Sequence, residues 1–478
     1  MGNSPTKPEE EEEEPPSIPS SQTQGDYEWP ISVYDEASDL AEASFLIYMF
    51  ARLIYVVRAH EQEFNENGGD AEEHDSVESI SAALKELESS IDNGSVIMRK
   101  FTPRQIETIV KNHFDYLKSS ENFDMNPQSL LDSLAKLIER VPADQPNALT
   151  LHDYDDIYQT DELVYAIGKD DIKKRITLIL RGTESHSGSA WSNWATNLSV
   201  WKTEVPVPPI TKEALEGGPN SDMESLWIHS GFYNYVYATT KNEKDEADTT
   251  KFDEIVQQLK ILCEENPDYK VYVTGHSLGA ALSTIFSLFL VNYTEPETQF
   301  TFPTPISCIN FASPRVGDGN LLTCVSALEE AGKLRVCRFV NDKDSITAVP
   351  SFNFYHVGFQ VKLYAAEGTT FTNDSGETVL ADDGTTPASP AYPPEVSYPK
   401  LVDSWWNKVG RAWDNSIVAS LNFGYDHGSY RERVLLNGTF LEKMDINEWY
   451  AEQTEWTGFS VAHGEFVKHD SDEKKTSE

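Results

Sequence analysis

The sequence is poor in cysteine, in positive charge and in long apolar runs. Its four cysteines are Cys263, Cys308, Cys324 and Cys337. Their spacing fits neither a zinc site nor a disulfide framework, so we expect four buried free thiols. No metal site is expected, because the acidic segment 373–377 (NDSGE) lacks the spacing of a calcium loop. Nothing in the sequence calls for a cofactor.

The shortage of positive charge restricts the choice of partners. Lysine and arginine number 38 against 79 aspartates and glutamates, which gives a net charge of -41. Such a surface repels nucleic acid and gains nothing from anionic lipid head groups. Neutral or zwitterionic substrates are not excluded. Part of the charge is local, because glutamates fill positions 9–14. Residues 1–26 are therefore expected to be a disordered acidic tail, and residues 466–478 a second charged tail.

No apolar run has the length and purity of a membrane span. The stretch ASFLIYMFARLIYVV is interrupted by Arg52, which favours a buried core helix. The N-terminus lacks the apolar core of a signal peptide, so we expect a cytoplasmic protein. The opening residues MGNSPT fit the pattern for N-myristoylation, which makes Gly2 a lipidation candidate. An unmodified Met-Gly start is the alternative that we favour, since the pattern is short and one acyl chain anchors only marginally.

Residues 27–145 have the pattern of a helical region. The segment SVESISAALKELESSID (76–92) has apolar residues at helical spacing. Two further segments, TPRQIETIVKNHFDYLKSS and NPQSLLDSLAKLIERV, each place a capping threonine or asparagine before a proline at the first helical position. We therefore predict several packed helices before residue 146.

The pattern changes near residue 150, where apolar strands begin to alternate with helices. Strands are predicted at 162–168 and 175–181, helices near 229–240 and at 251–264, and further strands in ISCINF and LRVCRFV. This alternation predicts a mostly parallel sheet with helices on both faces. Residues 146–465 are expected to form this α/β domain. The segment 367–399, rich in Gly, Thr, Asp, Ser and Pro, is expected to be a loop insertion.

The segment VYVTGHSLGAALSTIFSLFL is typical of a strand that turns directly into a helix. Its turn carries the G-X-S-X-G pattern from Gly275 to Gly279. In that arrangement the glycines let strand and helix pass closely, the serine is exposed on a sharp corner, and the helix N-terminus directs N–H groups at an oxyanion. An ordinary strand-turn-helix with incidental glycines is the alternative. Because both flanks have the required composition, Ser277 is predicted to be a nucleophile and Leu278 an oxyanion-hole donor.

A serine nucleophile needs a histidine base and a carboxylate that orients it, in the chain order Ser, Asp, His for this kind of turn. Asp344 follows an apolar strand; Asp342 is a close competitor and Asp318 a more distant one. Among the later histidines, His427 lies in a glycine-flanked loop before a final helix. His356 lies in a strand-like segment, so the loop position favours His427. Spacing alone leaves the choice of acid open.

Taken together, these motifs resemble the fungal-type (class 3) lipase family, serine hydrolases of the α/β-hydrolase fold. Over about residues 150–430, GHSLGA resembles the family's GHSLGG elbow, LRGT its FRGT/S oxyanion motif, and IHSGF its VHxGF segment. RFVNDKDSITAVP and YDHGSY resemble RxVNxxDxVPxLP and DHxxY. The resemblance implies an α/β-hydrolase fold with Asp344 as the acid, His427 as the base, and Thr183 with Leu278 in the oxyanion hole. It makes His229 and His356 structural positions.

The resemblance also implies a lid just after the oxyanion strand. In SHSGSAWSNWATNLSVW the apolar residues recur at about helical spacing: Trp191, Trp194, Leu198 and Trp201. By pattern alone such a stripe belongs to a core. In a lid it would cover the pocket in water and dock on lipid when open.

The expected function is hydrolysis of lipid carboxylic esters by a Ser-Asp-His triad with an acyl-enzyme intermediate, as in acylglycerol lipases. The expected partner is a lipid ester, reached through peripheral contact with a membrane or lipid droplet. One alternative is an inactive lipase-like module that binds lipid or protein through Trp405 and Trp406. Another is a thioesterase or peptidase of the same fold. A full set of triad residues argues against the first, and the tryptophan-rich segment favours lipid over the second.

Overall fold

The computed structural model describes the chain in blocks, and each statement below concerns these blocks. They are residues 33–67, 78–83, 88–90, 97–120, 123, 125–154, 163–182, 201–240, 249–342, 344–350, 353–364, 395–397, 427, 429–442, 461–462 and 465–466. The proposed tails, except residue 466, lie outside them, as do Gly2, Trp405, Trp406 and most of the segment 367–399.

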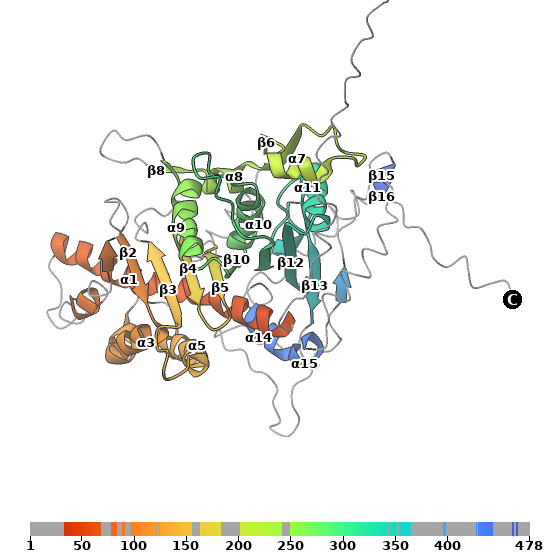
Figure 1. Cartoon of the computed structure of the whole chain (residues 1–478). Coiled ribbons are helices and arrows are strands. Elements are labelled where there is room, and N and C mark those ends of the chain that lie inside the picture. The colour runs from red at the N-terminus through yellow and green to blue at the C-terminus, as the bar shows by residue number, and fades with distance from the viewer. Residues whose placement is uncertain are drawn as a thin grey trace, which may run out of the picture.

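A ten-stranded sheet runs through the middle of the fold, with five parallel strands at its centre (Figure 1). The parallel strands are β5 (Arg175–Leu180), β10 (Lys270–Gly275), β11 (Ile306–Phe311), β12 (Leu334–Asn341) and β13 (Phe359–Leu363). Antiparallel strands extend one edge: β1 (Glu88–Ser90), β2 (Ile97–Phe101), β3 (Leu149–Tyr154) and β4 (Tyr165–Asp170). At the other edge β14 (Glu395–Ser397) pairs antiparallel with β13.

The central strands could be predicted from the sequence because they are buried. Every residue of β5, β11 and β12 is buried, because helices cover both faces of the sheet. Strands buried on both faces appear as nearly continuous apolar runs rather than as alternating ones. The predicted α/β-hydrolase fold with a mostly parallel central sheet is confirmed, and the antiparallel strands are additions at its two edges.

Two helical layers enclose the sheet (Figure 1). One layer contains α7 (Pro209–Leu215), α8 (Ser230–Val236), α9 (Lys251–Glu265), α10 (Leu278–Val291) and α11 (Gly319–Glu330). At the centre of this layer, α10 contacts β5, β10 and β11, and nearly all of its residues are buried. The same side carries the two-stranded ribbons β6 (Lys202–Pro206) with β7 (Ser225–His229) and β8 (Thr239–Thr240) with β9 (Thr249–Thr250).

The other layer is built around the long helix α1 (Val33–Asn67), which packs under β5, β10 and β11. Its neighbours are α3 (Pro103–Asn112), α4 (Phe114–Ser119), α5 (Pro127–Arg140), α14 (Tyr430–Leu436) and α15 (Gly438–Leu441). The predicted starts of α3 and α5 are confirmed, since Thr102 forms a capping box with Gln105 and Asn126 caps α5. Among the described residues, no helix is long and apolar enough to cross a bilayer.

Two local predictions are corrected. The segment 76–92 is not one helix: residues 78–83 are helical, but Glu88–Ser90 form β1 and pair with β2. Main-chain pairing with the next strand along the chain, β2, outweighs the local helical spacing, which is a weak prior. Likewise Glu395–Ser397, expected within a loop, join the sheet as β14. All four cysteines are buried and free, as predicted.

Where β10 turns into α10, the backbone passes very close to the end of β5. A Cβ atom on Gly279 would lie 2.1 Å from the carbonyl oxygen of Leu180, and one on Gly275 would lie 2.6 Å from the same oxygen. Real Cβ atoms do not approach backbone atoms this closely, so only glycine lets the turn rest on the end of β5.

We predict that Gly279→Ala destabilises the protein strongly. The added methyl group collides with backbone rather than with a mobile side chain, so the free energy of unfolding should fall by about 3 kcal/mol or more. Gly168→Ala on β4 is the matched control, because its nearest neighbour, Ile179 Cδ1, would lie at 3.8 Å. Urea unfolding measures both, and equal losses would contradict the prediction.

Three histidines with lowered pKa values, two of them buried and one, His356, half-buried, give the fold a sensitivity to acid. Burial lowers the pKa of His152 to about 4 and that of His276 to about 3. It also lowers the pKa of His356 well below its usual range. Each imidazole is therefore neutral in the folded chain, whereas in the unfolded chain it takes up a proton near pH 6.5.

The resulting prediction concerns stability against pH. Because the folded pKa values lie below the unfolded ones, stability is complete above about pH 6.5 and falls as the pH drops towards 4. We expect a loss of about 1 kcal/mol or more per pH unit between pH 6.5 and 5. The slope should be shallower for His152→Gln, which removes one of the three groups. Thermal melts from pH 7.5 to 5 measure this, and a flat profile would refute it.

Candidate active site

Ser277 sits on the sharp corner between β10 and α10. Its backbone adopts φ 61° and ψ -122°, a strained conformation for a residue with a side chain. The corner is held to the neighbouring strand by the Ser277 N–H, which donates to the Phe311 carbonyl at 2.9 Å. The hydroxyl is buried, and within the described part of the chain Ser277 Oγ has no hydrogen-bond partner. No structural contact therefore occupies this oxygen.

His427 and Asp344 are in direct contact, 83 residues apart in the chain. The Nδ1 atom of His427 lies 3.0 Å and 3.1 Å from the two carboxylate oxygens of Asp344, and both side chains are buried. Asp344 begins the short 3-10 helix η1 (Ser345–Ala348), where its Oδ1 accepts the Ile346 N–H at 2.9 Å. The carboxylate is thereby fixed in the orientation that holds the imidazole ring.

Tyr430 is a second partner of this carboxylate. Its hydroxyl donates to Asp344 Oδ2 at 2.6 Å and accepts the Asn341 N–H at 3.0 Å. Burial raises the pKa of Asp344, but the charge of His427 and the hydrogen bonds from His427 and Tyr430 outweigh it, so the pKa lies below its usual range. Asp344 is thus ionised and suited to stabilise an imidazolium. Sequence reasoning assigned no role to Tyr430, although the DHxxY spacing contains it.

The competing aspartates have other contacts. Asp342 forms an ion pair with Arg433 on α14. Asp318 caps α11, where its Oδ1 accepts the Leu321 N–H at 3.1 Å. Neither contact involves His427, so of the three aspartates considered from the sequence only Asp344 meets that ring in the described structure.

His356 and His229, the two other histidines considered from the sequence, both contact other parts of the fold. His356 donates from Nε2 to the Thr347 carbonyl at 2.6 Å. His229 is buried, with its ring against those of Phe232 and Phe354 at centroid distances of 4.2 Å and 5.6 Å. These contacts agree with the structural positions that the family resemblance implied.

His276, the residue before the serine, ties the corner to the distant base. Its Nε2 donates to the main-chain carbonyl of His427 at 2.7 Å, and the two rings lie 4.6 Å apart. Because Nε2 carries the proton and burial keeps the ring neutral, Nδ1 is an acceptor. The Tyr48 hydroxyl lies 3.3 Å from that Nδ1. The main chain of residue 427 is therefore held by the residue that immediately precedes Ser277.

Tyr48 links helix α1 to the loop expected to bind an oxyanion. The Gly182 N–H donates to the Tyr48 hydroxyl at 3.0 Å. A Cβ on Gly182 would lie only 2.2 Å from that oxygen, so the contact needs glycine. Sequence reasoning missed Tyr48, and no local signal could have found it, because it stands within an apolar run that reads only as a core helix.

The other predicted site residues are only partly within the described chain. Leu278 is the first residue of α10, where an N–H group has no acceptor within its own helix. Thr183 lies outside the described residues, and so do Trp191, Trp194 and Leu198. Trp201 is described; it immediately precedes β6 and is 73% exposed.

Known proteins share the segment that contains this corner. The family model for lipase (class 3) matches residues 177–354. Phospholipase A1-IIgamma of Arabidopsis thaliana is 32% identical over 139 residues, 28% of this chain and 32% of that protein. The chloroplastic galactolipase DONGLE of the same plant is 25% identical over 227 residues, 45% of this chain and 43% of that protein. The match thus spans less than half the length of these curated relatives.

Among solved structures, the triacylglyceride lipase of Rhizomucor miehei is 20% identical, with a TM-score of 0.32, over 56% of this chain and 83% of that one. The segment matched by the family model contains both the Ser277 corner and Asp344. Together with the α/β-hydrolase topology described above, this match shows that residues 177–354 of the chain are similar to the class 3 lipase family.

Proposed function

We propose that this chain is a serine hydrolase that cleaves a carboxylic ester of a polar glycerolipid. One observation carries the proposal. The His427 ring is hydrogen-bonded to Asp344 on one side, and its main chain is hydrogen-bonded to His276 beside the strained Ser277 on the other. These contacts support a site at the carboxyl ends of the central strands that combines a base, its orienting acid and an unengaged alcohol.

In the proposed mechanism the Ser277 hydroxyl attacks the ester carbonyl while His427 Nε2 takes its proton. Asp344 holds Nδ1 and stabilises the imidazolium that forms. Collapse of the tetrahedral intermediate releases the lipid alcohol, which receives the proton from His427, and leaves the acyl group on Ser277. Water, activated by the same imidazole, then releases the fatty acid and restores the serine.

The oxyanion is proposed to be bound by the N–H groups of Leu278 and Thr183. Leu278 stands at the N-terminus of α10, where the helix dipole favours negative charge. Gly182, which precedes Thr183, has its own N–H engaged by Tyr48. This contact fixes the backbone leading into Thr183, so we assign Tyr48 a positioning role in catalysis. Losing an oxyanion donor typically raises a barrier by about 2.7–4 kcal/mol.

The proposed substrate is a phospholipid or galactolipid, a narrower class than the lipid carboxylic esters expected from the sequence. The matched plant proteins carry the names phospholipase A1 and galactolipase, which supports this choice. The net charge of -41 disfavours anionic head groups, so phosphatidylcholine and galactolipids suit the surface better than phosphatidylserine.

A peripheral contact with a membrane would deliver this substrate. The exposed indole of Trp201, at the end of the candidate lid, supports such a contact. A cytoplasmic location and acylation of Gly2 are further proposals. The peripheral contact predicts that the full chain sediments with neutral vesicles, and acylation predicts that it does so more strongly when it is myristoylated.

The central test is Ser277→Ala. We predict that this change lowers hydrolysis of phosphatidylcholine and monogalactosyldiacylglycerol by about 10⁴-fold or more, because no other group in the mechanism can form the acyl-enzyme. Ser287→Ala on the same helix is the matched control, since its hydroxyl bonds back to the Ser283 carbonyl and has no part in the proposed mechanism. Fatty acid release from vesicles and labelling by a fluorophosphonate are measured side by side. Unchanged labelling of Ser277→Ala, or an unlabelled wild type, would overturn the assignment.

Tyr48→Phe tests the positioning role. The change removes one hydroxyl and with it the acceptor of the Gly182 N–H, so we expect kcat to fall about tenfold while KM changes little. Tyr34→Phe removes the same atom from the same helix, away from the Gly182 loop, and should leave kcat unaltered. A purely structural role for Tyr48 would instead lower the melting temperature without changing kcat.

A further inference from the structure

The short helix α14 carries the proposed base into the site. His427 stands two positions before Ser429, the N-cap of α14, and Tyr430 is the first residue of the helix. The helix has seven residues. Isolated helices of this length are marginal in water, because the first turn fixes several residues for a single hydrogen bond. The position of α14, and with it that of His427, therefore depends on contacts with the rest of the chain.

On one side, α14 is held by the loop that follows β12. The Tyr430 hydroxyl donates to Asp344, and Arg433 forms an ion pair with Asp342. Both carboxylates belong to the same short loop, so these contacts hold only one side of the helix. Arg431, which lies between the two residues that make them, contacts a different element.

On another side, α14 packs against helix α1. The Nε atom of Arg431 lies 2.9 Å from Glu42 Oε2 on α1, and this is the one ion pair that Arg431 makes with the described residues. Apolar packing brings the two helices together, since Ala37 and Ala41 of α1 belong to the same buried cluster as Val434 of α14.

The ion pair between Glu42 and Arg431 is largely withdrawn from water. The Glu42 side chain is 8% exposed and that of Arg431 is 19% exposed. Lys136 of α5 also approaches the Glu42 carboxylate, but at 3.7 Å and with 46% of its side chain exposed. A shift of α14 would separate Arg431 from a buried carboxylate, and an unpaired buried charge is costly. The pair therefore favours one position of the helix.

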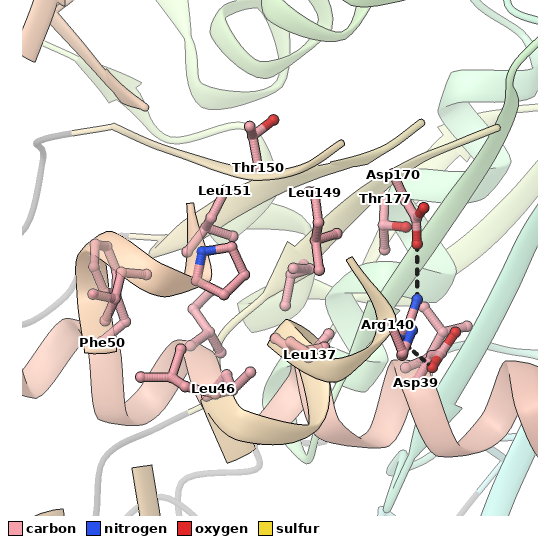
Figure 2. Close-up of a pocket in the computed structure, with 18 of the residues that line it drawn as sticks. Asp39, Leu46, Phe50, Leu137, Arg140, Leu149, Thr150, Leu151, Asp170 and Thr177 are labelled. Carbon is pink, nitrogen blue, oxygen red and sulfur yellow. Dashed lines mark hydrogen bonds and ion pairs between the residues drawn. The ribbon is translucent and has the colours of Figure 1, made fainter. Parts of the chain in front are cut away.

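Helix α1 is itself fixed on the sheet, and Figure 2 shows one of the contacts that hold it. Arg140 of α5 lies between Asp39 of α1 and Asp170 at the end of β4, and it donates to them at 2.6 Å and 2.8 Å. Further along α1, the Ser44 hydroxyl lies 3.0 Å from Thr274 Oγ1 on β10, the strand that leads to the proposed nucleophile. Helix α1 thus gives α14 a support that is fixed relative to that strand.

The same side of α1 also contacts two other parts of the site. The Phe45 ring lies 4.7 Å from the His276 ring, and the Tyr48 hydroxyl accepts the Gly182 N–H. Positions 42, 45 and 48 are three residues apart, so they follow one side of the helix. One helix outside the segment matched by the family model therefore contacts the base helix, the turn at the nucleophile and the loop expected to bind the oxyanion.

We propose that Glu42 and Arg431 are positioning residues for catalysis. Their ion pair holds α14 so that the His427 ring meets Asp344 and reaches Ser277. Helix α1 is thereby a built-in activator of the α/β domain, in addition to being part of its core. The inference rests on the proposed function, because a positioning role requires a reaction on which it acts.

Kinetics on the soluble ester p-nitrophenyl butyrate test the pair without a lipid surface. For Arg431→Leu and for Glu42→Leu we expect kcat to fall about tenfold with little change in KM, because the ester still binds while the base is misplaced. Arg431→Lys keeps a positive charge beside Glu42 and should retain most of kcat. Lys136→Gln is the matched control, since it removes the other cation near the same carboxylate without touching α14. Unchanged kcat in a folded Arg431→Leu protein would overturn the proposal, as would an equal loss in Lys136→Gln.

The double variant Glu42→Leu/Arg431→Leu separates positioning from a loss of stability. Because the two residues act through one contact, its kcat should be no lower than that of either single variant, whereas independent effects would multiply to about a hundredfold. It leaves neither partner as an unpaired charge, so it remains testable where a single variant does not fold. Thermal melts check folding. A wild-type kcat in the double variant, or a hundredfold loss, would contradict the role of the pair.

Labelling by a fluorophosphonate distinguishes failure of this inference from failure of the proposed function. We expect Arg431→Leu to be labelled about tenfold more slowly than the wild type, because the probe also needs the base to activate Ser277. An unlabelled wild type would overturn the proposed function and this inference with it. A wild type and an Arg431→Leu protein that are labelled equally fast would overturn the positioning role alone.

Discussion

The contact between two glycines and the end of β5 is the constraint on which the rest of the site depends. Gly275 and Gly279 let the start of α10 rest on the Leu180 carbonyl, where any side chain would collide. Beyond Leu180, the chain of β5 continues to Gly182. This glycine packs closely against the His276 carbonyl. Because β5 and β10 are neighbours in exact parallel register up to Gly275 and Leu180, the nucleophile and the oxyanion loop emerge side by side. Local strain at Ser277 is maintained by this packing.

Helix α1 is the second organising element, and it lies before the segment that matches the lipase family. Tyr48 on this helix contacts the Gly182 loop, Ser44 contacts Thr274 on β10, and Asp39 pairs with Arg175 on β5. The helix therefore does more than cover the sheet. These contacts between residues distant in the sequence tie the N-terminal region to the α/β domain.

The sequence predicted those features that are local or that carry a motif. The β10–α10 turn could be recognised because strand, glycines and helix are consecutive, and the buried central strands appear as apolar runs. Asp344 was separated from its competitors only by family resemblance, since spacing does not reveal that residues 83 positions apart touch. His427 was favoured by its loop position as well as by the resemblance. Their catalytic roles, and those of Thr183 and Leu278, stay predictions. Tyr48 was out of reach because its partner Gly182 is distant in the chain, and β1 was missed because apolar residues at helical spacing predicted a helix there.

His276 and His427 have different electrostatic roles at the corner. His276 is enclosed and neutral, so its proton sits on Nε2 and serves as a fixed donor to the His427 main chain. His427 has its Nδ1 against an ionised Asp344, which in the proposed mechanism stabilises the imidazolium formed when the ring takes the serine proton. A charged ring at position 276 would oppose that imidazolium at a centroid distance of 4.6 Å. Burial of His276 therefore both positions the proposed base and removes a competing charge from beside it.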